Sequence, residues 1–390
     1  MGPLQGVRVA EFAGIGPGPF GAMVLADLGA EVLRITRPGV STLLSEEGAD
    51  LLSAGRAELA LDLKDPAGAE RALAVVERAD ALIDPFRPGV MERNGLGPEV
   101  ALARNPRLVY ARMTGYGQDG PMAQRAGHDI NYISLTGALG ASARLGERPL
   151  FPLNLLGDFG GGGMLLALGV VSAVLHARTT GEGQVVDVAM VDGAALLTTM
   201  VQGLRQAGMW SEVAGTNLLD SGAPFYEVYE TADGRHVAVG ALEPQFHMRL
   251  LELLEIPAEE MGQWDRERWP EHRARLTETF RSRTRDEWSE LFAGEDACVT
   301  PVLGLHEAAG HPHARARASF VGAGGRAQLS AGGGAQLNAG EARSSAGEER
   351  ERPAPAPRFA RTPAEVHAVP PAPEELLRRW GVTPGTCPTD

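Results

Sequence analysis

Three short stretches of the chain carry side chains that could move a proton. His128 lies in "AGHDINYISLTG", directly before a pattern typical of a helix. An imidazole exchanges a proton near neutral pH, and backbone N–H groups at a helix start can receive negative charge as it develops. Asp158 lies in "LLGDFGGGGM", at the start of an apolar helix, and Glu243 follows a strand pattern in "GALEPQFHM". These residue types suit general acid–base chemistry.

Each of these residues also has a purely structural interpretation. His128 alone could be a capping or core histidine, Asp158 a helix N-cap, and Glu243 a first-turn acid favoured by the helix dipole. The four glycines of "FGGGGM" are harder to explain by helix formation, because each costs about 1 kcal/mol relative to alanine. They indicate that a ligand or another backbone comes very close.

A motif of dinucleotide-binding turns occurs near the N-terminus. The segment "GPGPFG", residues 16–21, follows the apolar run "VRVAEF" and matches G-x-G-x-x-G. Two of its residues, Pro17 and Pro19, have no N–H to offer a pyrophosphate. Arg37 stands where such folds place an acid on the ribose. Arginine suits the phosphorylated ribose of NADP or the 3′-phospho-ADP of coenzyme A, so a nicotinamide enzyme is disfavoured.

Composition and the remaining motifs disfavour other classes. The chain has 390 residues and a net charge of −14, which repels nucleic-acid backbones. His306 and His311 are five residues apart, whereas a zincin helix needs four, so we expect no metal. Neither a P-loop nor the G-x-S-x-G motif of α/β-hydrolases occurs.

Cysteine content and hydropathy predict a cytoplasmic protein without a membrane partner. The only two cysteines, Cys298 and Cys387, cannot form a disulfide framework, which favours a reducing compartment. The N-terminus lacks the pattern of a secretory signal. The most apolar helix pattern, residues 164–177, is too short to span a bilayer and predicts a core helix.

The order of the predicted elements indicates an α/β fold. Up to about residue 200, strand patterns such as "EVLRI", "ALIDPF" and "QVVDVAM" alternate with helical ones, which is typical of a doubly wound parallel sheet. After residue 222, "YEVYETADGRHVAVG" predicts a hairpin around Asp-Gly. We therefore expect a large domain over 1–200, a linker over 201–222, a small α+β domain over 223–320, and a flexible Gly/Ala-rich insert over 321–352.

The chain resembles the class III coenzyme A-transferase family, and within it the α-methylacyl-CoA racemase branch. The matching stretches are "LQGVRVAEFAGIGPGPFGAMVLADLGAEVLRITRPG", "LALDLK", "MTGYGQDGP", "AGHDINYIS", "GDFGGGGM" and "PAPAPRFARTP". The resemblance implies a large Rossmann-like domain completed by residues 353–390, and two chains interlocked as a homodimer. It implies an acyl-CoA substrate and no separate cofactor, since coenzyme A is part of the substrate.

The resemblance also implies roles for individual residues. His128 and Asp158 match the catalytic pair that moves the α-proton of a 2-methylacyl thioester, and Glu243, from the partner's small domain, assists the histidine. We expect the backbone N–H groups around Asp129 to stabilise the enolate oxygen, and burial to raise the pKa of Asp158. The residues it places near coenzyme A are Arg37, Leu61, Asp62, Leu63, Lys64, Gly127, Ile130, Asn131 and Tyr132.

Two other functions stay open on the sequence. In a CoA-transferase, Asp158 would attack the thioester and form a mixed anhydride, a route in which His128 has no obvious task. A non-catalytic CoA-binding scaffold is the second alternative, with the low-complexity insert as an interaction segment. The intact set of His128, Asp158 and Glu243 favours the racemase.

Overall fold

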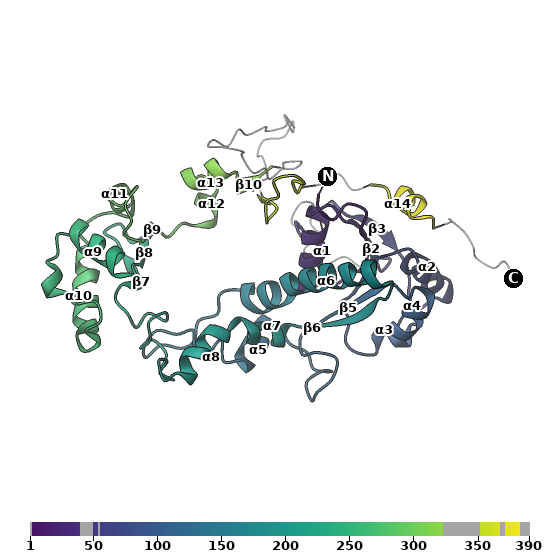
Figure 1. The fold of residues 1–390 in the computed structure, drawn as a ribbon, viewed down its shortest axis with the longest axis horizontal. Coiled ribbons are helices and arrows are strands. Elements are labelled where there is room, and N and C mark those ends of the chain that lie inside the picture. The colour runs from purple at the N-terminus through teal and green to yellow at the C-terminus, as the bar shows by residue number, and fades with distance from the viewer. Residues whose placement is uncertain (1, 40–49, 54, 323–351, 367–370, 383–390) are drawn as a thin grey trace. The chain divides into compact units, whose positions relative to one another are not determined.

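A computed structural model describes residues 2–39, 50–53, 55–322, 352–366 and 371–382 (Figure 1). The contacts within the chain define two compact units. Unit 1 comprises residues 1–136, 152–197 and 309–390, and unit 2 comprises residues 137–151 and 198–308. This division differs from the predicted domains, since residues 201–222 join unit 2 and residues 309–320 join unit 1. Most of the predicted insert, and Cys387, lie outside the described residues.

Unit 1 is built on a six-stranded parallel sheet, which confirms the predicted α/β fold. Its strand order is β3-β2-β1-β4-β5-β6, so the order reverses between β1 and β4. In such sheets, ligands bind in the crevice at the carboxyl ends of the strands, where the order reverses. The strands are β1 Arg8–Phe12, β2 Glu31–Thr36, β3 Ala57–Ala60, β4 Ala81–Asp84, β5 Val109–Thr114 and β6 Gln184–Ala189.

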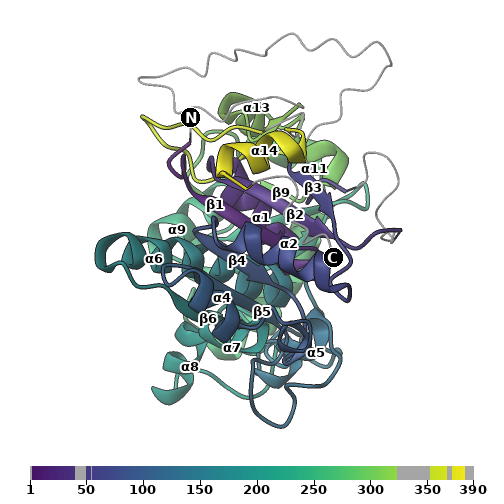
Figure 2. The same cartoon turned by 90° about the vertical axis from the view of Figure 1, so that its right-hand side faces the viewer.

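Helices cover both faces of this sheet. Helices α1 (Pro17–Asp27) and α6 (Leu165–Thr180) pack on the face that carries Val9 and Ile83. Helices α2 (Pro66–Val76), α4 (Pro98–Arg104) and α14 (Pro373–Trp380, yellow in Figure 2) pack on the other face. Helix α14 buries Leu376 and Leu377, each contributing about 1.5–3 kcal/mol, so the C-terminal segment completes the core of unit 1.

The helix predicted over 164–177 is part of a longer one. A π-helix, η1 (Leu155–Met164), runs directly into α6, and together they span 26 residues. By length and apolar composition alone, this helix could cross a membrane, and 44% of its most apolar window is buried inside the protein. One face of it packs on the sheet through Leu166, Val170 and Val174.

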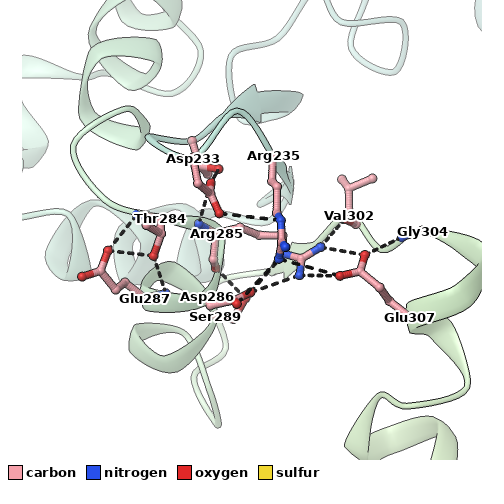
Figure 3. Close-up of polar contacts among 11 residues, drawn as sticks. Asp233, Arg235, Thr284, Arg285, Asp286, Glu287, Ser289, Val302, Gly304 and Glu307 are labelled. Carbon is pink, nitrogen blue, oxygen red and sulfur yellow. Dashed lines mark hydrogen bonds and ion pairs between the residues drawn. The ribbon is translucent and has the colours of Figure 1, made fainter.

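Unit 2 has an antiparallel sheet and its own core. The predicted hairpin forms from β7 (Tyr226–Glu230) and β8 (His236–Gly240), and a third strand, β9 (Val299–Pro301), pairs with β8. Helices α9 (Pro244–Leu253), α10 (Trp269–Phe280) and α11 (Arg285–Leu291) bury an aromatic-rich core beside the sheet. The buried Arg285 donates to Glu307 at 2.8 Å and to the carbonyl of Val302, which ties α11 to the chain after β9 (Figure 3).

Several shorter elements complete the two units. In unit 1 these are α3 Val90–Arg93, α5 Asp129–Leu135, α7 Met190–Leu197, α13 Pro312–Arg317, β10 Phe320–Val321 and β11 Arg352–Pro353. In unit 2 they are α8 Thr199–Gln206, η2 Ala258–Glu260, η3 Arg266–Arg268 and α12 Leu305–Ala308.

Candidate active site

The "GPGPFG" segment forms a tight turn between β1 and α1. Gly16 has φ +67° and occupies the N-cap position of α1, and Pro17 is the first helical residue, where a missing N–H costs nothing. An added Cβ on Gly16 would lie 3.4 Å from Oδ2 of Asp158. The Asp158 carboxylate therefore lies beside this turn, at the carboxyl edge of the sheet where the strand order reverses.

The glycines after Asp158 allow close approach of protein backbone. A Cβ on Gly163 would lie 2.9 Å from the carbonyl oxygen of Pro17 in α1, and one on Gly161 would lie 2.6 Å from the backbone nitrogen of Ala194 in α7. Such distances are shorter than van der Waals contact, so no side chain fits at these positions. The sequence left open whether these glycines make room for a ligand or for another backbone. At Gly161 and Gly163 the neighbour is another backbone.

Asp158 is a half-buried acid in the first turn of η1. Asn154, and not Asp158, occupies the N-cap position, and its side-chain amide donates to Oδ2 of Asp158 at 3.1 Å. Burial raises the pKa of the Asp158 carboxyl, and the negative charge of Asp129 raises it further. The hydrogen bond from Asn154 and the charge of His128 oppose this rise. The direction of the shift agrees with the expectation from the sequence.

His128 lies at the start of α5, close enough to Asp158 for the two charges to interact. The backbone of His128 is extended, and its backbone N–H donates to Oδ1 of Asn131 at 3.1 Å. The residue is exposed. Unit 1 alone thus brings together an exposed imidazole and a half-buried carboxyl that are 30 residues apart in the sequence (158 − 128). This pair has the composition of a two-base proton-transfer site.

Asp129, the next residue, is buried, with 3% of its surface exposed. Its carboxylate oxygen Oδ2 accepts hydrogen bonds from the backbone N–H groups of Gly157 and Asp158, at 2.6 and 2.7 Å. Its own backbone N–H donates no hydrogen bond among the described residues, and its role as the oxyanion donor stays a prediction. The sequence indicated the backbone of Asp129 but not the contacts of its side chain.

Glu243 lies in unit 2, at the N-cap position of α9. Its side chain is exposed and makes no capping hydrogen bond, so helix capping does not account for this residue. The remaining candidate catalytic residues belong to unit 1, and the assistance of Glu243 to His128 stays a prediction.

The residues assigned to coenzyme A fall into two groups in unit 1. Arg37 follows β2 and is exposed, and Leu61–Lys64 follow the neighbouring strand β3, with Asp62 and Lys64 exposed, Leu63 half-buried and Leu61 buried. Ile130 and Asn131 are exposed on α5, beside His128.

Tyr132 and Gly127 belong to the second group but have packing roles. The Tyr132 ring is buried, its hydroxyl donates to the carbonyl of Gly127, and its ring contacts that of Tyr116 with centroids 5.0 Å apart. Burial raises the pKa of Tyr132 to about 12, and the charge of Arg87 opposes this rise. A Cβ on Gly127 would lie 2.6 Å from the Tyr116 hydroxyl, which explains the glycine.

Arg87 is a candidate that the sequence reasoning missed. It follows β4, beside the reversal of strand order, and its exposed guanidinium is close enough to Tyr132 to influence its pKa. Among the described residues it forms no ion pair, so its charge is available to an anionic ligand. The arginine of "DPFRPG", at the carboxyl end of a buried strand, is the signal that could have identified it.

The comparisons establish the family of the protein. The sequence matches CoA-transferase family III over residues 4–373, and the chain belongs to this family. The resemblance found from the sequence motifs is therefore confirmed. Among the described residues, no three His, Cys, Asp or Glu side chains are grouped as metal ligands would be.

Two curated relatives are racemases. An α-methylacyl-CoA racemase of Mus musculus is 46% identical over 93% of this chain and 87% of that protein. The α-methylacyl-CoA racemase of Homo sapiens is 46% identical over 82% of each chain. Among solved structures, Rv3272 from Mycobacterium tuberculosis matches with a TM-score of 0.75 at 25% identity, over 96% of this chain and 98% of that one.

Proposed function

We propose that the protein is an α-methylacyl-CoA racemase, which interconverts (R)- and (S)-2-methylacyl-CoA thioesters. The observation that carries this proposal is that unit 1 holds His128 close enough to Asp158 for their charges to interact, in a chain 46% identical to two such racemases. The reaction needs two proton-transfer groups on opposite sides of one carbon, with opposite protonation states at the start.

In one direction, the neutral imidazole of His128 removes the α-proton, and the electron pair of the broken C–H bond moves to the thioester oxygen. The backbone N–H of Asp129 donates to this oxyanion, a contribution of about 3 kcal/mol for one such donor. The protonated carboxyl of Asp158 then donates its proton to the opposite face of the carbon. In the other direction the two groups exchange roles, and Glu243 of the partner chain orients the imidazole.

The exposed cations at the carboxyl edge of the sheet suit the phosphates of coenzyme A. Arg37 follows β2, Lys64 follows the adjacent β3, and Arg87 follows β4, which β1 separates from β2. Three places along this edge thus offer positive charge within a protein of net charge −14. Arginine binds phosphate through two parallel hydrogen bonds. Coenzyme A enters as part of the substrate, and the reaction needs no further cofactor.

The functional form is an interlocked homodimer in the cytoplasm. Unit 1 exposes a series of large apolar side chains along η1, α6 and α7, and a second copy of the chain would cover them. They are Leu155, Met164, Leu168, Leu175, Leu196 and Leu197, each at least 45% exposed. Exposed apolar patches of this kind mark protein–protein interfaces. The dimer also supplies Glu243 to the partner's site.

The function is tested by incubating (S)-2-methyldecanoyl-CoA with the protein in deuterated water. We expect deuterium at the α-carbon by mass spectrometry, together with loss of optical purity. His128→Ala and Asp158→Asn should each abolish the loss of optical purity, because inversion needs both groups, whereas His236→Ala, which removes an exposed histidine of β8, should not. Transfer of CoA to an added acid, with an anhydride trapped at Asp158, would instead identify a CoA-transferase.

A further inference from the structure

The side chain of Asp129 links the two segments that carry the catalytic groups. The residue is covalently next to His128, and its Oδ2 accepts the backbone N–H of Asp158 at 2.7 Å and that of Gly157 at 2.6 Å. These distances are at the short end for N–H···O bonds, as expected for a charged acceptor. One carboxylate therefore joins the start of α5, which carries the base, to the first turn of η1, which carries the acid.

Residue 157 has to be glycine for this contact to form. A Cβ on Gly157 would lie 2.8 Å from Oδ2 of Asp129 and 3.1 Å from its Cγ. Unlike Gly161 and Gly163, which make room for α7 and α1, Gly157 makes room for a side chain. The glycine before Asp158 is thus an independent sign that the carboxylate contact is built into the sequence.

The charge of Asp129 is not neutralised by a neighbouring cation. Among the described residues it forms no ion pair, and its second oxygen, Oδ1, is buried without a hydrogen-bond partner. A negative charge so close to Asp158 disfavours a second negative charge there. The charge of Asp129 therefore raises the pKa of Asp158, as burial does, whereas the hydrogen bond from Asn154 and the charge of His128 lower it.

We propose that the Asp129 carboxylate is a positioning residue, which fixes Asp158 relative to His128 and keeps the Asp158 carboxyl in its proton-donating form. The proposal rests on the racemase function and deepens it. It assigns two separable effects to one side chain: two hydrogen bonds that set geometry, and a charge that sets protonation.

Asp129→Asn separates these effects, because the amide oxygen can still accept the two N–H bonds while the charge is lost. We expect the limb of the pH–rate profile that reports Asp158 to move to lower pH, with KM for the acyl-CoA within twofold of wild type. Asp129→Ala removes both effects. Since a misplacement of about 1 Å costs on the order of 10²-fold in rate, we expect deuterium exchange to fall by about 10²-fold. Gly157→Ala, which displaces the carboxylate, should lower the rate similarly.

Asp187→Asn is the matched control, because the Asp187 carboxylate also accepts a backbone N–H, from Gln118 at 3.1 Å, and does not act on Asp158. This variant should leave both rate and pH profile unchanged. If the limb that reports Asp158 lies at the same pH in Asp129→Asn as in wild type, the proposed role of the charge is wrong. A rate within twofold of wild type in Asp129→Ala would overturn the role in positioning.

A second measurement is independent of activity. Titration of ¹³C-labelled aspartate carboxyls by NMR, with Asp158→Asn used for assignment, follows Asp158 in the resting protein. We expect its midpoint at lower pH in Asp129→Asn than in wild type, and an unchanged midpoint refutes the proposal. If wild type fails to exchange deuterium while this midpoint moves, the racemase function is wrong and the electrostatic coupling stands.

Discussion

A buried ion pair beneath α1 provides a sharp test of the energetics of unit 1. Glu11 on β1 and Arg56, directly before β3, form an ion pair at 2.8 Å, and both side chains are fully buried. Arg56 also donates to the carbonyl of Pro19 at 3.0 Å, within the first turn of α1. Burial raises the pKa of Glu11 and lowers that of Arg56, so each charge depends on the other.

Removing one charge of this pair should cost far more than removing both. Glu11→Gln leaves the Arg56 guanidinium buried without its ion-pair partner. Arg34, which pairs with Glu11 at 3.8 Å and with Glu58 at 2.8 Å, adds a second positive charge nearby. We expect unit 1 to lose about 3–5 kcal/mol in its free energy of unfolding. The double replacement Glu11→Leu with Arg56→Met, which removes both charges and keeps the volume, should cost less than Glu11→Gln.

The assay is urea unfolding followed by hydrogen exchange in peptides of β1 and β2, which report unit 1. Glu77→Gln is the matched control, because Glu77 pairs with Arg104 at a similar distance, 2.6 Å, but both side chains are substantially exposed. This variant should shift the unfolding midpoint little. The reasoning fails if Glu11→Gln costs no more than Glu77→Gln, or if the double variant is the least stable of the set.

The remaining predictions concern pH and assembly. Burial raises the pKa of Asp84 to about 6, from an unfolded value near 4, so its contribution to stability is present below pH 4 and lost as pH rises through 6. The free energy of unfolding of unit 1 should therefore fall by up to about 3 kcal/mol as pH rises across this range. In urea titrations at pH 4 to 7, Asp84→Asn should lack this pH dependence. The proposed dimer should dissociate when Leu168 and Leu175, both exposed on α6, are replaced by Glu. A dimer that persists in sedimentation would refute that interface.

The parallel sheet could be predicted because its central strands β1, β2, β4 and β5 are mostly apolar runs, as strands covered on both faces are. The runs "VRVAEF" and "EVLRI" became β1 and β2 almost unchanged. The run "LALDL", residues 59–63, also has the pattern of a strand, but β3 spans Ala57–Ala60. Its partner strand β2 ends at Thr36, which pairs with Ala60, so the ladder has no further partner for residues 62 and 63.

Other features depend on contacts that sequence patterns do not encode. The three-residue strand β9 forms only because β8, about 60 residues earlier, offers a free edge (299 − 240 = 59). The π-helix η1 depends on the packing of its glycines against α1 and α7. The role of the Asp129 side chain could not be read from "GHD" either, because its partners are backbone N–H groups 28 and 29 residues away.

The environment of Asp158 explains why a carboxyl and an imidazole can share one reaction. The ordinary pKa of Asp, about 3.9, lies well below that of His, about 6.5, so at neutral pH both groups would start as bases. Racemisation needs one of them protonated at the outset. Half-burial in η1 and the adjacent Asp129 both raise the pKa of Asp158, while His128 stays exposed to solvent. The glycines that let η1 pack so closely are therefore also what creates the buried environment for this acid. We infer that this backbone packing, as much as the choice of the two side chains, raises the pKa of Asp158 and so favours the protonated carboxyl that can donate a proton.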